Sequence, residues 1–290
     1  MQQVYFNKTM DREDLSNVSA KKIIDELNSL IIRLKNENLK ISSWYGRFDL
    51  SGDKNSLEWI NRGIDYAPLS NAVDDTNYPW FLYWEIVWLV LHNDFMPGQK
   101  VLDMGGTSSL FSYYLASKGM EVTTIDLQEN LVENANYTAS KMNWNLKNIV
   151  MNMKDLYFNE QFDHITSVCV FEHIPIYDRV EINKEMKKCL KIGGNFSITF
   201  DYRNPSKAAQ INSPEDVESQ FITTSGLSPR GNMPFLDNGK NYLLHPFYSN
   251  KVSNYRKQAV EQGLFDASEI DAVKTENDYT FGALFLRNEG

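Results

Sequence analysis

The chain has 290 residues, and its 42% hydrophobic content is enough to build a sizeable core in a single α/β domain. Its formal net charge of −9 disfavours nucleic acid as a partner, because an acidic surface repels phosphate backbones. The polar N-terminus has no signal-peptide core, and the most apolar window, residues 80–91, is too short to span a bilayer, so we expect a soluble, cytoplasmic protein without membrane contact.

Residues 1–95 are predicted to form an N-terminal extension of helices and loops. An apolar stripe at helical spacing predicts a helix over residues 16–40, and an almost wholly apolar helix follows Pro79. The second helix is expected to be buried in the core or in a homodimer interface. Between them lies a loop-rich, aromatic segment, residues 42–77, which we expect to cover the core or line a pocket. It supplies two substrate-binding candidates, Tyr45 for a cation and Arg47 for a carboxylate or phosphate.

From residue 96 onward strands and helices alternate, which predicts a parallel sheet with right-handed crossovers. The expected strands are Val101–Met104, Glu121–Asp126, Ile149–Met153, Phe162–Phe171, Asn195–Asp201, Phe265–Val273 and Tyr279–Arg287. The expected helices are Ser109–Lys118, Glu129–Met142, Tyr177–Leu190 and Asn250–Gln262. A long segment without clear periodicity, residues 203–249, interrupts the alternation and is typical of a functional insertion.

The first strand of this region ends in Asp103-Met104-Gly105-Gly106-Thr107, and the second ends in Asp126. Glycines allow a tight turn and close approach of a ligand, and an acid about twenty residues on is typical of ribose binding. The third glycine of a dinucleotide fingerprint is missing. A carboxylate at the turn would repel a diphosphate but suits a ligand with a cationic amine.

This segment resembles the first motif of the class I S-adenosylmethionine-dependent methyltransferases, and the later elements fit the same family from about residue 97 to 288. The resemblance implies a doubly wound, mostly parallel seven-stranded sheet with helices on both faces and an antiparallel last strand. It implies that Asp103 serves the methionine amine, that Gly105 and Gly106 pass beneath the methionyl part, and that Asp126 binds the ribose. The hydroxyls of Thr107, Ser108 and Ser109 either cap the following helix or touch the methionyl carboxylate, and Thr107 is a candidate cofactor-binding residue.

The same resemblance implies further cofactor contacts at the ends of later strands. Asp155 and the backbone amide of Leu156 would bind adenine, whose amine donates beside a ring nitrogen that accepts. Leu127 is a candidate to cover one adenine face. The backbone carbonyls of Val170 and Phe171 would meet the methionine amine.

Candidate catalytic and acceptor-binding residues lie at the same sheet edge and in the insertion. His173 and His245 are candidate general bases because the histidine pKa lies near neutrality, although His173 could instead only orient its loop. Asp201 could hold the nucleophile or act as a base. Substrate candidates at this edge are Glu172, Tyr202 and Arg203. Some relatives bind a divalent metal with the help of a second acid three residues before the Glu-His pair. In this chain Cys169 stands at that position, so no metal site is predicted.

The sequence therefore predicts an enzyme that transfers a methyl group from S-adenosylmethionine to an oxygen, nitrogen or sulfur atom of a small molecule by in-line displacement. The product of the cofactor would be S-adenosylhomocysteine. The catalytic domain would span residues 96–290, including the insertion 203–249. Three alternatives remain open at this point: a protein or glycan acceptor, an NAD-dependent oxidoreductase on a similar sheet, and a non-catalytic binding protein with a remnant pocket.

Overall fold

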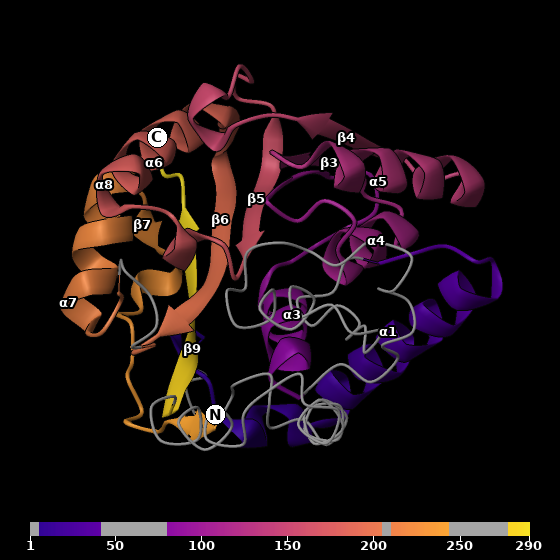
Figure 1. The fold of residues 1–290 in the computed structure, drawn as a ribbon. Helices are drawn as coiled ribbons and strands as arrows, with labels where there is room; N and C mark the ends of the chain where they lie inside the picture. Colours follow the sequence, from indigo (N-terminus) through magenta and orange to yellow (C-terminus); the bar gives the residue numbers. More distant parts are fainter. Residues whose placement is uncertain (1–5, 42–79, 205–209, 244–277) are drawn as a thin grey trace, which may run out of the picture.

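The computed structural model describes residues 6–41, 80–204, 210–243 and 278–290 (Figure 1). Their centre is a mixed β-sheet with helices on both faces. Among the described residues, no helix combines the length and the apolar character that crossing a membrane would require.

The sheet is parallel over five strands and antiparallel at its C-terminal strand, as the sequence predicts. In spatial order its main strands are β4 (Leu146–Val150), β3 (Glu121–Asp126), β2 (Lys100–Met104), β5 (Phe162–Val168), β6 (Leu190–Tyr202), β9 (Asp278–Arg287) and β1 (Lys8–Thr9). Two further short strands, β7 (Ser228–Pro229) and β8 (Tyr242–Leu243), also pair with β9. Strand order reverses between β2 and β5, which is where open α/β sheets bind ligands.

Two hydrophobic cores lie on the two faces of the sheet, because successive side chains of each strand point to opposite faces. Val101 of β2 belongs to one core and Leu102 to the other. The first core packs under α1 (Val18–Asn36), α3 (Trp80–His92), α4 (Leu110–Ser117) and α5 (Glu129–Met142). The second packs under α6 (Ile176–Cys189) and a helical run made of α7 (Pro214–Val217), the π-helix η5 (Glu218–Ile222) and α8 (Thr223–Ser225). The remaining short helices are η1 (Arg12–Ser16), η3 (Met153–Asp155), η4 (Phe171–His173) and η6 (Arg230–Asn232).

Several predicted boundaries agree with the structure, and the exceptions have local causes. The strand Glu121–Asp126 and the helix Glu129–Met142 have the predicted bounds, and α5 ends because Asn143 adopts the left-handed conformation. The third strand was predicted at 149–153 but ends at Val150, since Asn152 caps the 3₁₀ turn η3. The helix predicted at Tyr177–Leu190 ends at Cys189, and the next strand begins at once, with Gly193 and Gly194 inside β6.

The sheet is wider than the seven strands expected, with nine strands among the described residues. Three of the nine are two residues long and carry no periodicity that a sequence could reveal. Of the predicted elements, the helix at 250–262 and the strand at 265–273 lie outside the described residues.

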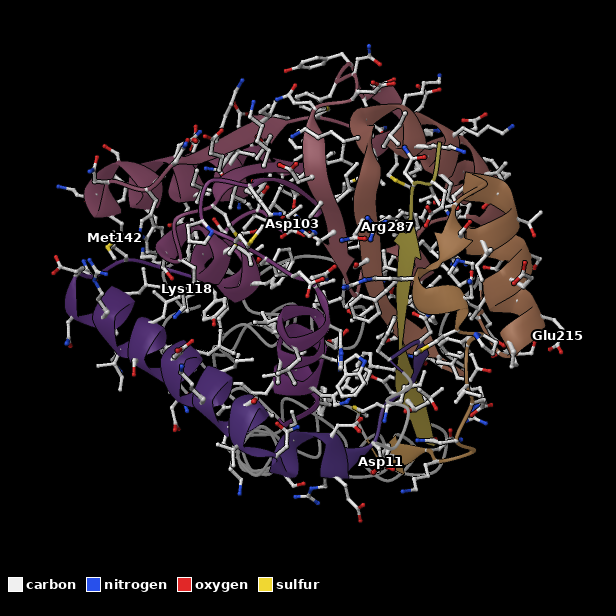
Figure 2. All side chains as sticks on the ribbon, turned by 180° about the vertical axis from the view of Figure 1, so that it is seen from behind. Asp11, Asp103, Lys118, Met142, Glu215 and Arg287 are labelled. Carbon is white, nitrogen blue, oxygen red and sulfur yellow. The ribbon has the colours of Figure 1, made fainter. Side chains whose placement is uncertain are left out.

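The N-terminal residues pair directly with the central β-sheet. Thr9 pairs with Gly282 of β9, and its backbone amide donates to the carbonyl of Leu236 in the insertion at 2.9 Å. Further along, Lys118 of α4 forms a 2.8 Å ion pair with Glu26 of α1, and the two helices lie side by side (Figure 2). Residues 6–41 therefore contact the sheet at β9, through Thr9, and the helix α4, through Glu26.

Candidate active site

The turn after β2 is built around the buried carboxylate of Asp103, which lies in the interior beside the central sheet (Figure 2). The hydroxyl of Thr166 donates to its Oδ1 at 3.0 Å, and the hydroxyl of Ser112 donates to its Oδ2. A Cβ added to Gly106 would lie 1.9 Å from that same Oδ2, so only glycine fits here. The carboxylate thus braces the glycine turn, while its contact with a methionine amine stays a prediction.

Burial raises the pKa of Asp103 to about 6, although the hydrogen bonds from Ser112 and Thr166 oppose the shift. Because the folded pKa lies above the ordinary value of 3.8, this group stabilises the fold fully below pH 3.8, and that stabilisation is lost as the pH rises through about 6. The difference amounts to about 3 kcal/mol at about 1.4 kcal/mol per pKa unit.

We therefore expect Asp103→Asn to remove this pH dependence. The free energy of unfolding of the wild type, minus that of the variant, should fall by about 3 kcal/mol between pH 3 and pH 7 in urea titrations. The matched control is Asp25→Asn, which makes the same substitution at an exposed position on α1. A pH dependence for Asp103→Asn no larger than that of this control would contradict the assigned cause.

The three hydroxyl residues after the glycines support the turn and the helix that follows. Thr107 donates to the hydroxyl of Thr124 at 2.7 Å, and Ser108, at φ +62°, donates to the carbonyl of Leu131 at 2.7 Å. Ser109 is the N-cap of α4 and accepts from the backbone amide of Ser112 at 3.1 Å. Ser109 thus caps the following helix, whereas Thr107 is tied to β3, and a contact of Thr107 with the cofactor stays a prediction.

The ends of β3 and β4 lie beside the glycine turn. The amide of Gly105 donates to the carbonyl of Ile125, and the amide of Met151 donates to the carbonyl of Asp126, each at 2.9 Å. Asp126 accepts from the amide of Gln128 at 3.0 Å, and partial burial raises its pKa. The structure thus brings the predicted ribose acid next to the glycine turn.

The residues predicted to bind adenine follow the neighbouring strand. Asp155 is exposed at the end of η3, and Leu156 is buried behind it. Leu127 is 69% exposed, which is uncommon for leucine and leaves an apolar surface at this edge. The edge at which the adenine is predicted is therefore lined by the exposed Asp155 and Leu127, with the buried Leu156 beside them.

The end of β5 closes the other side of the turn. A Cβ added to Gly105, which has φ +78°, would lie 2.9 Å from Cγ2 of Val170. Phe171 is fully buried and packs edge-on against Phe196 and Phe221, which fixes the start of η4. Val170 and the glycine turn thus face one another across the switch point of the sheet.

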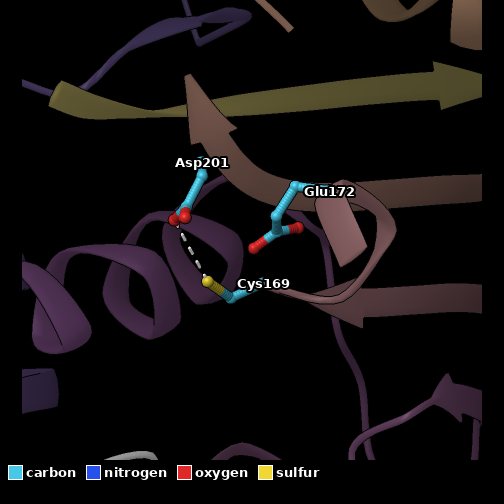
Figure 3. A group of neighbouring side chains, drawn as sticks. All are labelled: Cys169, Glu172 and Asp201. Atoms are coloured by element: carbon cyan, nitrogen blue, oxygen red, sulfur yellow. Dashed lines mark hydrogen bonds between the residues drawn. The ribbon is translucent and has the colours of Figure 1, made fainter. Parts of the chain in front are cut away.

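Beside Val170, three potential ligand-bearing side chains converge from different elements (Figure 3). Cys169 follows β5, Glu172 lies in η4, and Asp201 ends β6; their ligand atoms all lie within 4.8 Å of one another. The thiol of Cys169, a residue with φ +56°, donates to Oδ1 of Asp201 at 3.5 Å, and Asn204 donates to Oδ2 at 2.6 Å. Backbone strain of this kind clusters at functional sites.

The predicted base His173 lies at the rim of this cluster. It follows Glu172 in η4, and its Nε2 lies 3.9 Å from Oε1 of that carboxylate. Its side chain is 33% exposed, whereas Glu172 is buried. His173 therefore lies where a base could reach both solvent and the cluster.

Tyr202 and Arg203 are engaged with the insertion rather than with the cluster. The hydroxyl of Tyr202 donates to Asp237 at 3.3 Å, and Arg203 forms a 3.1 Å ion pair with the same carboxylate. Tyr202 is buried, and the guanidinium of Arg203 lies over its ring. The structure thus assigns both a packing contact, and their substrate role stays a prediction. Tyr45, Arg47 and His245 lie outside the described residues.

Sequence reasoning missed one residue that the structure adds to the site. Glu85 of α3 is fully buried, and Thr199 of β6 donates to its Oε1 at 2.8 Å. Burial raises the pKa of Glu85 well above its ordinary value, and the nearby carboxylates Glu172 and Asp201 raise it further. The available signal was a single acid inside an otherwise apolar helix, which is costly to bury without a reason.

The comparisons with known proteins agree with this fold. Residues 102–198 match the family model of a methyltransferase domain. A ubiquinone biosynthesis O-methyltransferase from Xanthomonas campestris pv. campestris is 31% identical over 116 residues, which cover 39% of this chain and 48% of that protein. The chain therefore matches about half the length of this curated relative.

Two solved structures share the fold at low sequence identity. The [4+2]-cyclase SpnF has a TM-score of 0.54 at 15% identity, and the match covers 92% of this chain and 94% of SpnF. Phosphoethanolamine N-methyltransferase 2 from Haemonchus contortus, in complex with S-adenosylhomocysteine, has a TM-score of 0.50 at 16% identity, covering 70% of this chain and 51% of that one.

The sheet order and the glycine turn agree with the family match. Residues 102–198 form a Rossmann-like unit similar to the methyltransferase domain of that family, as the sequence predicts.

Proposed function

We propose that this chain transfers a methyl group from S-adenosylmethionine to a small-molecule acceptor. The observation that carries the proposal is the turn at Gly105 and Gly106, which is so tight that a Cβ at either position would meet Val170 or Asp103. It lies at the carboxyl edge of the sheet, beside Asp126 on one side and the polar cluster of Cys169, Glu172 and Asp201 on the other.

The residues around the turn fit the parts of this cofactor. The glycine turn would allow close backbone approach of the methionyl part, Asp126 would bind the ribose hydroxyls, and Asp155 with Leu156 would bind adenine. S-adenosylmethionine supplies an already activated methyl group, so the protein's task is to orient the acceptor and exclude water. Glu172 and Asp201 are the acceptor-side groups that we assign to this orientation, with His173 as the candidate base.

Fold alone does not decide the reaction, since one structural neighbour is a cyclase. Calorimetric titration with S-adenosylmethionine and with NADH tests the proposal directly. We expect saturable binding of the first and none of the second, because Asp103 disfavours a diphosphate at the turn. Binding of NADH, or of neither compound, would sink the proposal; formation of S-adenosylhomocysteine with a small acceptor would complete it.

The acceptor class and the assembly remain proposals too. The curated relative is named for O-methylation in ubiquinone biosynthesis, and H. contortus has an N-methyltransferase of similar fold, so the names favour small acceptors without choosing an atom. Homodimer formation and the boundary near residue 95 also stay predictions, which sedimentation and limited proteolysis can test.

A further inference from the structure

Three carboxyl groups that are far apart in the sequence approach one another beneath the acceptor side of the site. Glu85 belongs to α3, Glu172 to η4 and Asp201 to β6, and their exposed fractions are 0%, 2% and 3%. Glu172 and Asp201 share their space with Cys169, and both act electrostatically on Glu85. Carboxyl groups gathered in this way attract a cation.

Glu85 adds an independent observation. Its Oε1 accepts a hydrogen bond from Thr199, but its Oε2 is buried and has no hydrogen-bond partner. Leaving a buried oxygen unsatisfied is costly, so such a group in a folded protein calls for an explanation. A donor that enters with a ligand would satisfy it.

The nearest charged groups of the described chain limit what that ligand is. The guanidinium of Arg179 acts on Glu172 from α6, but it is directed to the carbonyl of Ile174 and to the side chain of Gln220. His173 lies on the solvent side of Glu172. Neither group is recorded as acting on Glu85, whereas the thiol of Cys169 lies near enough to lower its pKa. Because that thiol already donates to Asp201 at 3.5 Å, a ligand with its own donors would serve Oε2 better.

We infer that Glu85, Glu172 and Asp201 form an acceptor subsite for a protonated amine. An alkylammonium group offers three donors and one positive charge, which match carboxyl oxygens from three elements. This inference rests on the proposed function and goes beyond it by naming the acceptor class. An alcohol offers a single donor and no charge, and an anionic acceptor would be repelled.

The subsite also accounts for the proton that methylation must remove. The ammonium group transfers one proton to a carboxylate of the subsite, which leaves a neutral amine and a carboxylic acid. The nitrogen lone pair then forms the bond to the methyl carbon, and the electron pair of the broken carbon–sulfur bond stays on sulfur. The products are the methylated ammonium ion and S-adenosylhomocysteine, so charge and atoms balance. Buried carboxyls near one another can hold such a proton.

The test uses the full chain, saturated with S-adenosylhomocysteine, and matched ligands. Benzylamine, phenethylamine and butylamine are each titrated by calorimetry against the alcohol with the same carbon skeleton. We expect at least one amine to bind about 30-fold more tightly than its alcohol at neutral pH, as a paired buried charge implies. Equal affinities in all three pairs, or binding of neither series, would overturn the inference.

Isosteric variants test whether Glu85 contributes to amine binding. In Glu85→Gln the affinity for the amine should fall about 30-fold, while affinity for S-adenosylmethionine changes less than about twofold. Glu133→Gln, at an exposed position on α5, is the matched control and should change neither. A variant that loses S-adenosylmethionine instead of the amine would contradict the subsite. If Glu85→Gln does not fold, the comparison of amine with alcohol in the wild type still decides.

The same experiments separate this inference from the proposed function. A wild type that binds S-adenosylmethionine but methylates only phenols or alcohols would end the amine subsite and keep the methyltransferase. A wild type that binds no S-adenosylmethionine would end the proposed function itself.

Discussion

Gly105→Ala is expected to lower the affinity for S-adenosylmethionine by about 100-fold or more. Two effects combine at this position. Gly105 has φ +78°, where a side chain strains the backbone, and its Cβ would lie 2.9 Å from Cγ2 of Val170 and 3.0 Å from Cε of Met153. To relieve these contacts the turn must move away from the end of β5, which removes the close approach that the cofactor needs. Calorimetric titration measures the loss.

The chain provides a control that carries the strain without the contact. Gly98 has φ +82°, but a Cβ there would meet no atom within 4 Å. Gly98→Ala should therefore cost only the backbone strain, about 1–2 kcal/mol of unfolding free energy, and leave cofactor binding unchanged. Binding by Gly105→Ala within threefold of the wild type would show that the turn is not where the cofactor lies.

The parallel part of the sheet could be predicted from the sequence because its signals are local. The run 121–126 alternates and ends in an acid, and the helix 129–142 ends at an asparagine that tolerates the left-handed conformation. The pairing of β1 with β9 could not be predicted in this way. Lys8 and Ala283 meet across almost the whole chain, and a two-residue strand has no period to read.

The residues of the candidate site also fall into two groups: those that local spacing predicts and those that only tertiary packing brings together. Asp103, the glycines and Asp126 lie within one strand–helix–strand unit, so their spacing alone placed them together. Glu85 reaches the site only through the packing of α3 against β6, and its neighbours Glu172 and Asp201 are distant in sequence. The hydroxyl partners of Asp103 were equally hidden, because Thr166 comes from another strand. Convergence of this kind depends on tertiary packing.

Arg179→Met is expected to destabilise the fold by about 3–5 kcal/mol, because it removes one partner from a buried, charged network. Arg179 is fully buried on α6, and burial lowers its pKa to about 10, so it remains charged at neutral pH. Its Nε donates to the carbonyl of Ile174 at 2.9 Å, and Nη1 donates to Oε1 of Gln220 in the π-helix η5. The guanidinium therefore ties the loop after Glu172 to the insertion.

Methionine keeps most of the volume of the side chain but supplies no donor, so the acceptors on Ile174 and Gln220 would be buried without partners. Urea unfolding of Arg179→Met measures the cost, and Arg33→Met, at an exposed position on α1, is the matched control with an expected change below about 0.5 kcal/mol. Asn183 donates to the carbonyl of Gln220 at 2.9 Å and to Thr224 at 2.7 Å, so it holds the same helix independently. A cost below about 1 kcal/mol for Arg179→Met would mean that Asn183 alone anchors the insertion, and that the loop carrying Glu172 keeps its position without the arginine.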